Sequence, residues 1–518
     1  MRPSLSPRGV RPQAPEMLQD ATKGAPQRRM LLEGVAQALL TGMIIAVVLT
    51  PVMIGFVTMI YGHPEFATVM PMLTKLIFMS SVAHQLAITF LSPMPYAIAQ
   101  TQDAGLIFLS AMAVSIMTEL GDSVPMEDRI ATVVVHLSIS ALLVGLGLIA
   151  IGKLRLASLV QYLPTPVIGG YLAYIGFFMI KGGITLMTGA SLTGIASWGQ
   201  LYDAHLVALL APGLICGIFL SVISARYQHF AVFPCCLIAV PLIFFFILFA
   251  TGHSVQDARA YGFLSEETNT ISLAEVYGLF DFKRIHWEVM FPQQIPTMLS
   301  MFLVIAFASS LDIASICMGT GWNMDYNEQL QTVGASNLTV FSHRFHPAAA
   351  EKQIPGFSRL VGLSLAACEL GIVLLPFSLT TVVPKFLFGS VMIFIGVDLL
   401  RTWLFGVHSK LLMPEYATVI SSFLFLNAFG VQMGLAAGVA LAAVIFLVEY
   451  SKGQPIRIVN KTSNVIRNAE QHQLLYSAVQ GNGNQSEALM KGQPIVTVEV
   501  QGHIFFGRTM SSELLTKE

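Results

Sequence analysis

The chain has 518 residues, of which 54% are hydrophobic and 11% are charged. A soluble domain carries about 25% charged residues, so this composition predicts an integral membrane protein built of helices. The formal net charge of −1 gives no overall field for binding nucleic acid. The five cysteines lie in apolar segments without metal-ligand spacing, so we expect no metal and no cofactor.

The first 30 residues form a polar, proline-containing segment that we expect to be a disordered cytoplasmic tail. Its cytoplasmic side follows from an excess of basic residues, which are Arg2, Arg8, Arg11, Lys23, Arg28 and Arg29. A membrane domain is expected over 31–450. Within it, the loop 252–291 is polar but has no catalytic constellation, so the sequence does not indicate an enzyme.

Apolar segments long enough to cross a membrane recur along this domain. They are 33–60, 68–91, 129–152, 161–187, 204–225, 230–251, 293–318, 360–376, 384–404, 412–430 and 431–449. Broken elements at 92–117 and near 330–345 bring the total to 13 or 14. If the broken element near 330–345 is counted, both termini are expected in the cytoplasm.

The broken element 92–117 contains Asp103 at the head of an apolar run. Ala104–Met117 is about 14 residues, or roughly 21 Å of helix, too short for a hydrocarbon core of about 30 Å. Irregular backbone is tolerated at membrane depth where it lines a cavity, and a helix start there attracts an anion. This pattern predicts the central site of a transporter. The alternative is that Asp103 only caps a short buried helix.

Asp312 lies near the middle of the span 293–318. A carboxylate there costs about 2.5–3.5 kcal/mol on insertion scales, so it faces a cavity or a partner. Asp312 is therefore a candidate for a proton or cation site, with Ser309, Ser310 and Ser315 nearby; the alternative is a protonated carboxyl bonded to a neighbouring helix. His84 is a weaker candidate, since a lone buried histidine also forms interhelical hydrogen bonds.

After Glu449 the composition turns polar, and 451–492 is expected to be a linker. Residues 494–507 alternate between apolar and polar residues as a pair of β-strands would. We expect 493–518 to be the start of a further domain that the chain cuts short.

Several of these segments resemble the SulP/SLC26 family of anion transporters. The segments that carry this resemblance are Gln161–Gly176 (QYLPTPVIGGYLAYIG), Leu330–Asn337 (LQTVGASN) and Val383–Asp398 (VPKFLFGSVMIFIGVD). Ile495–Gly507 is similar to the first strands of a STAS domain. The resemblance implies an all-α polytopic fold with a seven-plus-seven inverted repeat, core and gate domains, and the start of an α/β STAS domain. It also implies a homodimer and a site between the starts of the third and tenth helices.

That site would contain Gln102, Asp103, Ala104, Gly105 and, on the tenth helix, Ser342. Gln102–Gly105 replaces a Gly-Pro pair of classical members, and Tyr326–Gly334 is similar to a branch of fungal vacuolar membranes linked to basic amino acids. After Asn337 about a dozen residues of a Gly/Ser-rich turn are missing, so we expect a disrupted region near 338–355.

The sequence therefore predicts a secondary transporter of an inorganic anion such as sulfate, with Asp312 and Asp103 as candidates for proton coupling. One alternative is transport of basic amino acids into a vacuole-like compartment, with two intramembrane carboxylates favouring a cationic substrate. Another is a membrane scaffold that has lost transport. The plasma membrane and the vacuolar membrane are both compatible with the sequence.

Overall fold

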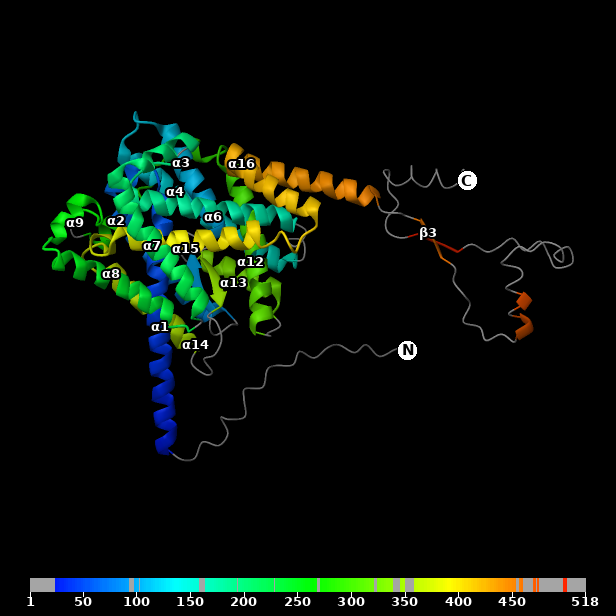
Figure 1. Ribbon diagram of the computed structural model, residues 1–518, viewed down its shortest axis with the longest axis horizontal. Coiled ribbons are helices and arrows are strands. Elements are labelled where there is room, and N and C mark those ends of the chain that lie inside the picture. Colours follow the sequence, from blue (N-terminus) through cyan, green and yellow to red (C-terminus); the bar gives the residue numbers. More distant parts are fainter. Residues whose placement is uncertain are drawn as a thin grey trace. The chain divides into compact units, whose positions relative to one another are not determined.

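The computed structural model describes most of the chain, and the grey trace in Figure 1 marks the remainder. The described residues are 24–92, 97–101, 103–157, 164–192, 194–227, 229–267, 271–320, 324–338, 345–349, 358–452, 456–459, 469–471, 473–474 and 497–500. They belong to two compact units, Met1–Gly438 and Val439–Glu518.

The first half of the larger unit contains helices at the predicted spans. Its main elements are α1 (Gly24–Ile60), α2 (Met70–Leu91), β1 (Ala97–Thr101), α3 (Asp103–Leu120), α4 (Met126–Lys153), α6 (Thr165–Thr188), α7 (Ala204–Arg226) and α8 (Val232–Ala250). The break predicted within 92–117 is confirmed, because a short strand precedes the 18-residue helix α3. Pro93 and Pro95 lack backbone donors, so α2 cannot continue through this segment.

The polar loop 252–291 contains three short helices, α9 (Val255–Tyr261), α10 (Leu273–Gly278) and α11 (Trp287–Met290). Ser254 and Ser272 cap the first two, since each hydroxyl accepts a hydrogen bond from the backbone of the third helical residue. The Arg284 guanidinium forms an ion pair with Glu127 at the start of α4. The loop is therefore attached to the helices of the first half.

The second half begins with α12 (Ile295–Thr320). It continues with α13 (Tyr326–Leu338), β2 (Phe345–Ala349), α14 (Ser358–Leu374), α15 (Lys385–Leu400) and α16 (Met413–Lys452). Ten helices in the described part of the chain are long and apolar enough to cross a membrane. Many apolar side chains on α7 and α8 are exposed, including Ile218, Leu242 and Phe246, as expected of surfaces that face lipid. The chain is an integral membrane protein.

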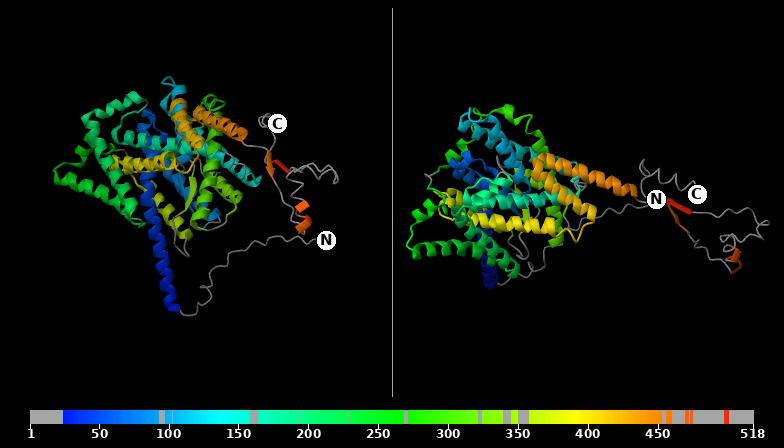
Figure 2. Two further views of the ribbon diagram at one scale, coloured as in Figure 1. Left: turned by 45° about the vertical axis from the view of Figure 1, so that its right-hand side comes forward. Right: turned by 45° about the horizontal axis from the view of Figure 1, so that its top comes forward.

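Glycines allow two pairs of helices, α6 with α15 and α4 with α13, to approach closely. A methyl group added to Gly176 of α6 would lie 2.6 Å from the carbonyl oxygen of Gly396 of α15, and the reverse distance is 2.5 Å. The corresponding distances between Gly145 of α4 and Gly334 of α13 are 2.8 and 2.6 Å. Small residues at such crossings are typical of membrane helix pairs. Figures 1 and 2 show α6 and α15 side by side.

These pairings relate the two halves as an inverted repeat. α4 packs on α13, whereas α14 packs on α2. In the chain, α6 is the next long helix after α4, and α15 is the next after α14; α6 and α15 also pack on each other. The positions of α4 and α14 are thus equivalent, and the predicted inverted-repeat fold is confirmed.

The second repeat lacks a described counterpart of α3. In the first repeat β1 is followed by α3 and then α4, but among the described residues β2 is followed directly by α14. Ser342, where the tenth helix was predicted to begin, lies outside the described residues, and the next described segment, Phe345–Ala349, is a strand. Pro347 would fall inside a helix that began near Ser342, where it removes a hydrogen bond and clashes with the preceding turn.

The last apolar element, α16, consists of two helices that meet at Gly430. That residue has φ 77° and ψ 178°, a conformation available to glycine. A methyl group on Gly434 would lie 2.6 Å from the Leu426 Cα atom, and one on Gly438 would lie 2.7 Å from the Ser422 hydroxyl. Residues eight or more positions apart are about 12 Å apart along a straight helix. The chain therefore reverses at Gly430, which confirms the predicted spans 412–430 and 431–449.

The smaller unit contains one described pair of strands. β3 (Ile456–Val459) pairs antiparallel with β4 (Thr497–Val500), and Ile456 lies opposite Val500. β4 lies in the segment where strands were predicted. Its partner was not predicted, because β3 falls inside the segment expected to be a linker.

Candidate functional site

Asp103 is the first residue of α3 and its side chain is half-buried. The carboxylate Oδ1 accepts a hydrogen bond of 2.7 Å from the Ala104 N–H. A carboxylate in the first turn interacts favourably with the helix dipole. Asp103 thus lies inside the first turn, and its hydrogen bond is to the next N–H rather than to the N–H groups that an N-cap side chain binds. Because the negative charge lies beside the remaining N–H groups of the first turn, both signs of charge are available to a ligand there.

Tyr171 of α6 holds the start of α3 in position. Its buried hydroxyl donates a hydrogen bond to the Ala104 carbonyl oxygen. The Tyr171 ring also stacks on Phe108, one helical turn further along α3, with ring centroids 5.8 Å apart. Ala104 and Gly105 are buried beneath these contacts. A movement of α6 relative to α3 would therefore change the surroundings of the predicted site.

The two short strands pair with each other directly before α3. β1 and β2 are antiparallel, with Thr101 opposite Phe345 and Ala97 opposite Ala349. The Ala99 N–H of β1 donates a hydrogen bond of 2.7 Å to Oε1 of Gln85 on α2. This buried side chain fixes the strand and so fixes where α3 begins. Backbone that would otherwise be unsatisfied at membrane depth is thereby paired.

His84 lies beside Gln85 on α2 and is fully buried. Its Nδ1 atom is 2.8 Å from the Ser80 carbonyl oxygen of the same helix. The Asn337 side chain of α13 also interacts with the ring. These contacts favour the interhelical role over a role as a ligand.

Asp312 lies on α12 and is half-buried. Ser309 and Ser310 are buried on the same helix, and Ser310 donates a hydrogen bond of 2.9 Å to the Ala306 carbonyl oxygen. α12 packs on α3 and on β2, so it shares the central region with the start of α3. The predicted polar character around Asp312 is present there, whereas the Ser315 side chain and all of Gln102 lie outside the described residues.

Glu369 of α14 is a buried carboxyl that we did not predict. Its side chain is 1% exposed. The signal was available in the sequence, because Glu369 is the one charged residue in the apolar run Leu363–Leu375. The same reasoning that singled out Asp312 applies to it.

The described residues do not suggest bond-making chemistry. Within them no group of three His, Cys, Asp or Glu side chains is positioned to hold a metal ion. The five cysteines form no disulfide bond, and Cys216 is buried among apolar side chains. The arrangement is suited to binding a small charged ligand between helices.

Comparison with known proteins links this arrangement to transport. The sequence profile of the sulfate permease family matches residues 35–420. The vacuolar basic amino acid transporter VSB1 of Saccharomyces cerevisiae is 26% identical over 428 residues. That alignment covers 78% of this chain but 39% of the relative, so the chain spans well under half of the relative's length.

Solved structures share the fold. The overall structure of SLC26A9 has a TM-score of 0.58 at 17% identity, covering 89% of this chain and 76% of that one. The transmembrane domain of the cyanobacterium bicarbonate transporter BicA has a TM-score of 0.54 at 17% identity, covering 79% of this chain and 97% of that one. Murine Slc26a9 in the inward-facing state has a TM-score of 0.59 at 16% identity, covering 84% and 72%.

Proposed function

The chain belongs to the sulfate permease family, a family of transporters rather than enzymes, and from this premise we propose that it is a secondary transporter of a small inorganic anion such as sulfate. The observation that carries the proposal is the start of α3. There β1 ends, opposite the first residue of its partner strand β2, and a short helix begins among packed helices.

Electrostatics supports an anion at this position. The first four N–H groups of a helix have no partner within the helix, and the helix start carries a partial positive charge. Each such terminus contributes roughly 0.3–2 kcal/mol to binding an anion, depending on burial. Ala104 and Gly105 are buried, which favours the upper part of that range. Asp312 on the adjacent α12 is our candidate for the coupling proton.

A basic amino acid is the second candidate substrate, and Asp103 is the observation that favours it. Its carboxylate already lies against the first N–H of α3, so it offsets the positive helix end. An amino acid with a cationic side chain offers a carboxylate to the remaining N–H groups and a positive charge to Asp103. The 26% identical relative is described as a vacuolar basic amino acid transporter, which agrees with this alternative.

Uptake into proteoliposomes tests both candidates. Purified protein is reconstituted, and accumulation of labelled sulfate and labelled arginine is measured with and without an inward proton gradient. Uptake of labelled sulfate that unlabelled arginine does not inhibit supports the first proposal. Uptake of labelled arginine that unlabelled sulfate does not inhibit supports the second. Uptake of neither, from correctly folded protein, would support the alternative of a scaffold that has lost transport.

We also infer that both termini face the cytoplasm and that the chain works as a homodimer in the plasma membrane or a vacuolar membrane. The basic tail supports the orientation. A protease that removes a tag at Met1 from sealed vesicles exposing the non-cytoplasmic side would contradict it. Cross-linking in native membranes tests the dimer.

A further inference from the structure

Glu369 is an isolated carboxyl in the interior of the helix bundle. It lies on α14, its side chain is 1% exposed, and neither carboxyl oxygen has a hydrogen-bond partner among the described residues. Burying an ionised carboxylate without donors is far more costly than burying a neutral acid. The position therefore suits a carboxyl that carries a proton when the helices are packed as they are here.

The face of α2 opposite Glu369 is polar along its length. Ser81, Gln85 and Thr89 follow one another at intervals of four residues and are all buried. The α14 helix runs antiparallel along them. Gly362 packs against Gln85 and Thr89, and the Ser81 hydroxyl interacts with Glu369 two turns later. The Ser81 hydroxyl is itself without a hydrogen-bond partner among the described residues, so a small side-chain rotation would join it to the carboxyl.

This polar row leads to the central strands. Gln85 Nε2 donates a hydrogen bond of 2.9 Å to the Thr89 hydroxyl, while Oε1 accepts the Ala99 N–H of β1 at 2.7 Å. β1 ends at Thr101, two residues before Asp103, which is the first residue of α3. A change in the charge or position of Glu369 thus has a route of contacts to the proposed substrate site.

On its other side, Glu369 lies one helical turn from a small cavity between α2 and α14. The cavity has a volume of about 10 Å³, which is the lower limit for one water molecule. It is lined by Pro71, Thr74, Lys75, Phe78, Ile372, Val373, Phe377, Ser378 and Leu379. The Lys75 ammonium donates hydrogen bonds to the carbonyl oxygens of Leu375, at 2.7 Å, and Ile271, at 3.0 Å. Water at this point would be a source of protons for the carboxyl.

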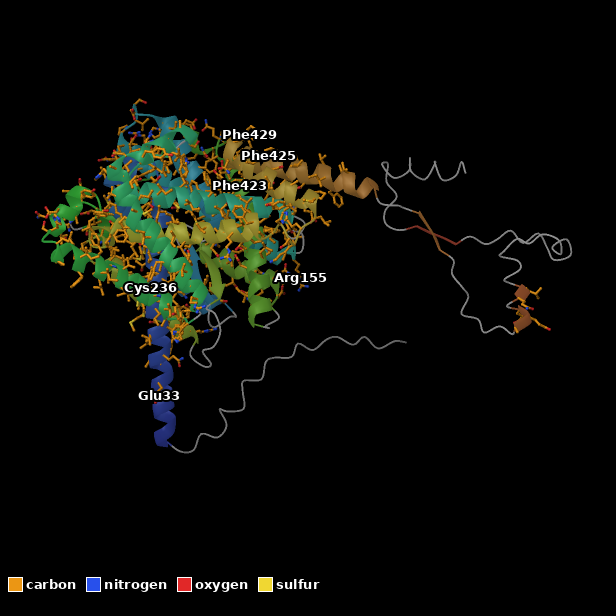
Figure 3. The ribbon with its side chains drawn as sticks, viewed as in Figure 1. Glu33, Arg155, Cys236, Phe423, Phe425 and Phe429 are labelled. Atoms are coloured by element: carbon orange, nitrogen blue, oxygen red, sulfur yellow. The ribbon has the colours of Figure 1, made fainter. Side chains whose placement is uncertain are left out.

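Other titratable groups on the elements packed against α14 are few. α2 contributes Lys75 at the cavity and His84, which faces α13, and the described residues of β1 contribute none. Among the described side chains of α1 the one acid or base is Glu33, which Figure 3 shows on the part of α1 beyond the neighbouring helices. On α14 itself, Cys368 adjoins Glu369 and Arg359 is exposed.

We propose that Glu369 is a proton-binding carboxyl, loaded from the cavity between α2 and α14 and linked through Ser81 and Gln85 to the strand that leads into Asp103. The role in coupling rests on the proposed transport function, whereas proton binding itself does not. A proton that arrives from solvent as hydronium at the cavity binds the carboxylate, which leaves a water molecule and the neutral acid. Release of the proton restores the carboxylate, so no other reactant is required.

Infrared difference spectroscopy of the purified protein between acidic and alkaline pH tests proton binding without any transport. The carbonyl band of a buried protonated carboxyl should be present in wild type and absent in Glu369→Gln. It should persist in Glu328→Gln, which changes an exposed carboxyl on α13. Ser81→Ala should shift the pH at which the band disappears, and it serves as the second variant if Glu369→Gln does not fold. An unchanged band in either Glu369→Gln or Ser81→Ala overturns the proposal.

Proteoliposome accumulation tests the coupling. If one proton moves with each substrate molecule, a gradient of one pH unit at zero membrane potential raises equilibrium accumulation about tenfold. Glu369→Gln should abolish this gain and retain exchange of labelled for unlabelled substrate. Gradient-driven accumulation at the wild-type level in Glu369→Gln would refute the coupling role. If wild type transports nothing, the proposed function fails, and the infrared result still decides whether Glu369 binds a proton.

Discussion

The stretch from β1 to α4 and the stretch from β2 to α14 hold equivalent places in the inverted repeat, but in the part of the chain that the structure describes the first contains one helix more. The first has a strand, a half-helix with Asp103 at its start, and a long helix. In the described residues the second has a strand followed directly by α14. The half-helix is the element that would carry a second set of free N–H groups toward the ligand. The difference between the repeats therefore affects the proposed binding site.

The packing of the long helices is equivalent in the two repeats. α4 packs on α13 and α14 packs on α2, while α6 crosses α15 through two pairs of facing glycines, Gly176 with Gly396 and Gly183 with Gly389. None of these contacts needs a second half-helix. The packing of this fold and its proposed ligand site therefore depend on different elements. The packing and the site can be altered separately.

The largest expected effect comes from breaking a shared crossing. Gly396→Leu puts a side chain where a first carbon would already lie 2.5 Å from the Gly176 carbonyl oxygen. Overpacking against backbone costs about 1–3 kcal/mol or more, so we expect little folded protein by size-exclusion chromatography in detergent. Gly371→Leu on α14 is the matched control, since nothing lies within 4 Å of its added carbon. Equal yields of the two variants would show that the crossing is not required.

The next effect comes from supplying a counterpart of α3, which is absent from the described residues of the second repeat. A Gly/Ser-rich turn followed by a copy of Ala104–Leu120, inserted between Ala349 and Ser358, adds a second positive helix end. A buried helix terminus contributes up to about 2 kcal/mol to binding an anion. Because about 1.4 kcal/mol corresponds to a tenfold change in Kd, we expect the added terminus to raise anion affinity roughly tenfold. Sulfate binding and uptake at matched membrane abundance measure it, and the turn alone is the control. No gain over the turn alone would show that one half-helix suffices.

Asp312 lies beside both stretches, because α12 contacts α3 and β2. If Asp312 carries a coupling proton, Asp312→Asn should keep its membrane abundance and flatten the pH dependence of uptake, which for one titrating group is up to tenfold per pH unit. If its role is structural, the variant should fail to accumulate. Wild-type flux with unchanged pH dependence would remove Asp312 from the mechanism.

Asp103 distinguishes the start of α3 from a bare helix terminus, so its charge sharpens the comparison further. Asp103→Asn keeps an acceptor for the Ala104 N–H and removes the negative charge. A charge near a helix terminus contributes about 0.3–1 kcal/mol, which corresponds to a change of roughly two- to fivefold in affinity. We expect sulfate to bind more tightly and arginine more weakly, measured by competition. A parallel change for both substrates would argue against an electrostatic role.

The smallest effect concerns the loop that joins the repeats. Hydrogen bonds from the Ser254 N–H and hydroxyl, at 2.7 and 2.8 Å, lower the pKa of the exposed Asp257 carboxyl. Because the folded-state pKa is below the unfolded one, the carboxylate stabilises α9 at neutral pH, and this contribution is lost as the pH falls below about 4. Hydrogen exchange of Val255–Tyr261 should therefore rise at acidic pH in wild type. A similar rise in Asp257→Asn would exclude this cause.

Local patterns in the sequence were sufficient for most helices. Apolar length identified the spans, and Pro93, Pro95 and Asp103 identified the break before α3, because each signal lies within a few residues of its effect. Pairing across long distances left no such signal. The strand Phe345–Ala349 is defined by its partner Ala97–Thr101, about 250 residues earlier, and Ile456–Val459 by Thr497–Val500.

For the candidate site, sequence alone identified Asp103 and Asp312, both carboxylates in apolar surroundings. It did not identify Tyr171 or Gln85 as the residues that hold α3 and β1, because those roles depend on which backbone atom lies opposite each side chain. Glu369 had the same signal in the sequence as Asp312, a single carboxyl in an apolar run, but it was not predicted. Its significance depends on the polar face of α2, which only the packing reveals.

The reversal at Gly430 has a consequence for how this part of the chain can vary. The turn has no loop residues, and Gly434 and Gly438 contact the preceding helix from positions four and eight residues later. Each residue advances a helix by about 100°, so one inserted or deleted residue after Gly430 would rotate both glycines off the contact face. Surface loops of membrane proteins tolerate changes in length, but here the connection is fixed in length and in rotational phase. Insertions and deletions should therefore be excluded between Leu426 and Gly438, while point substitutions on the outer face of the same hairpin are tolerated.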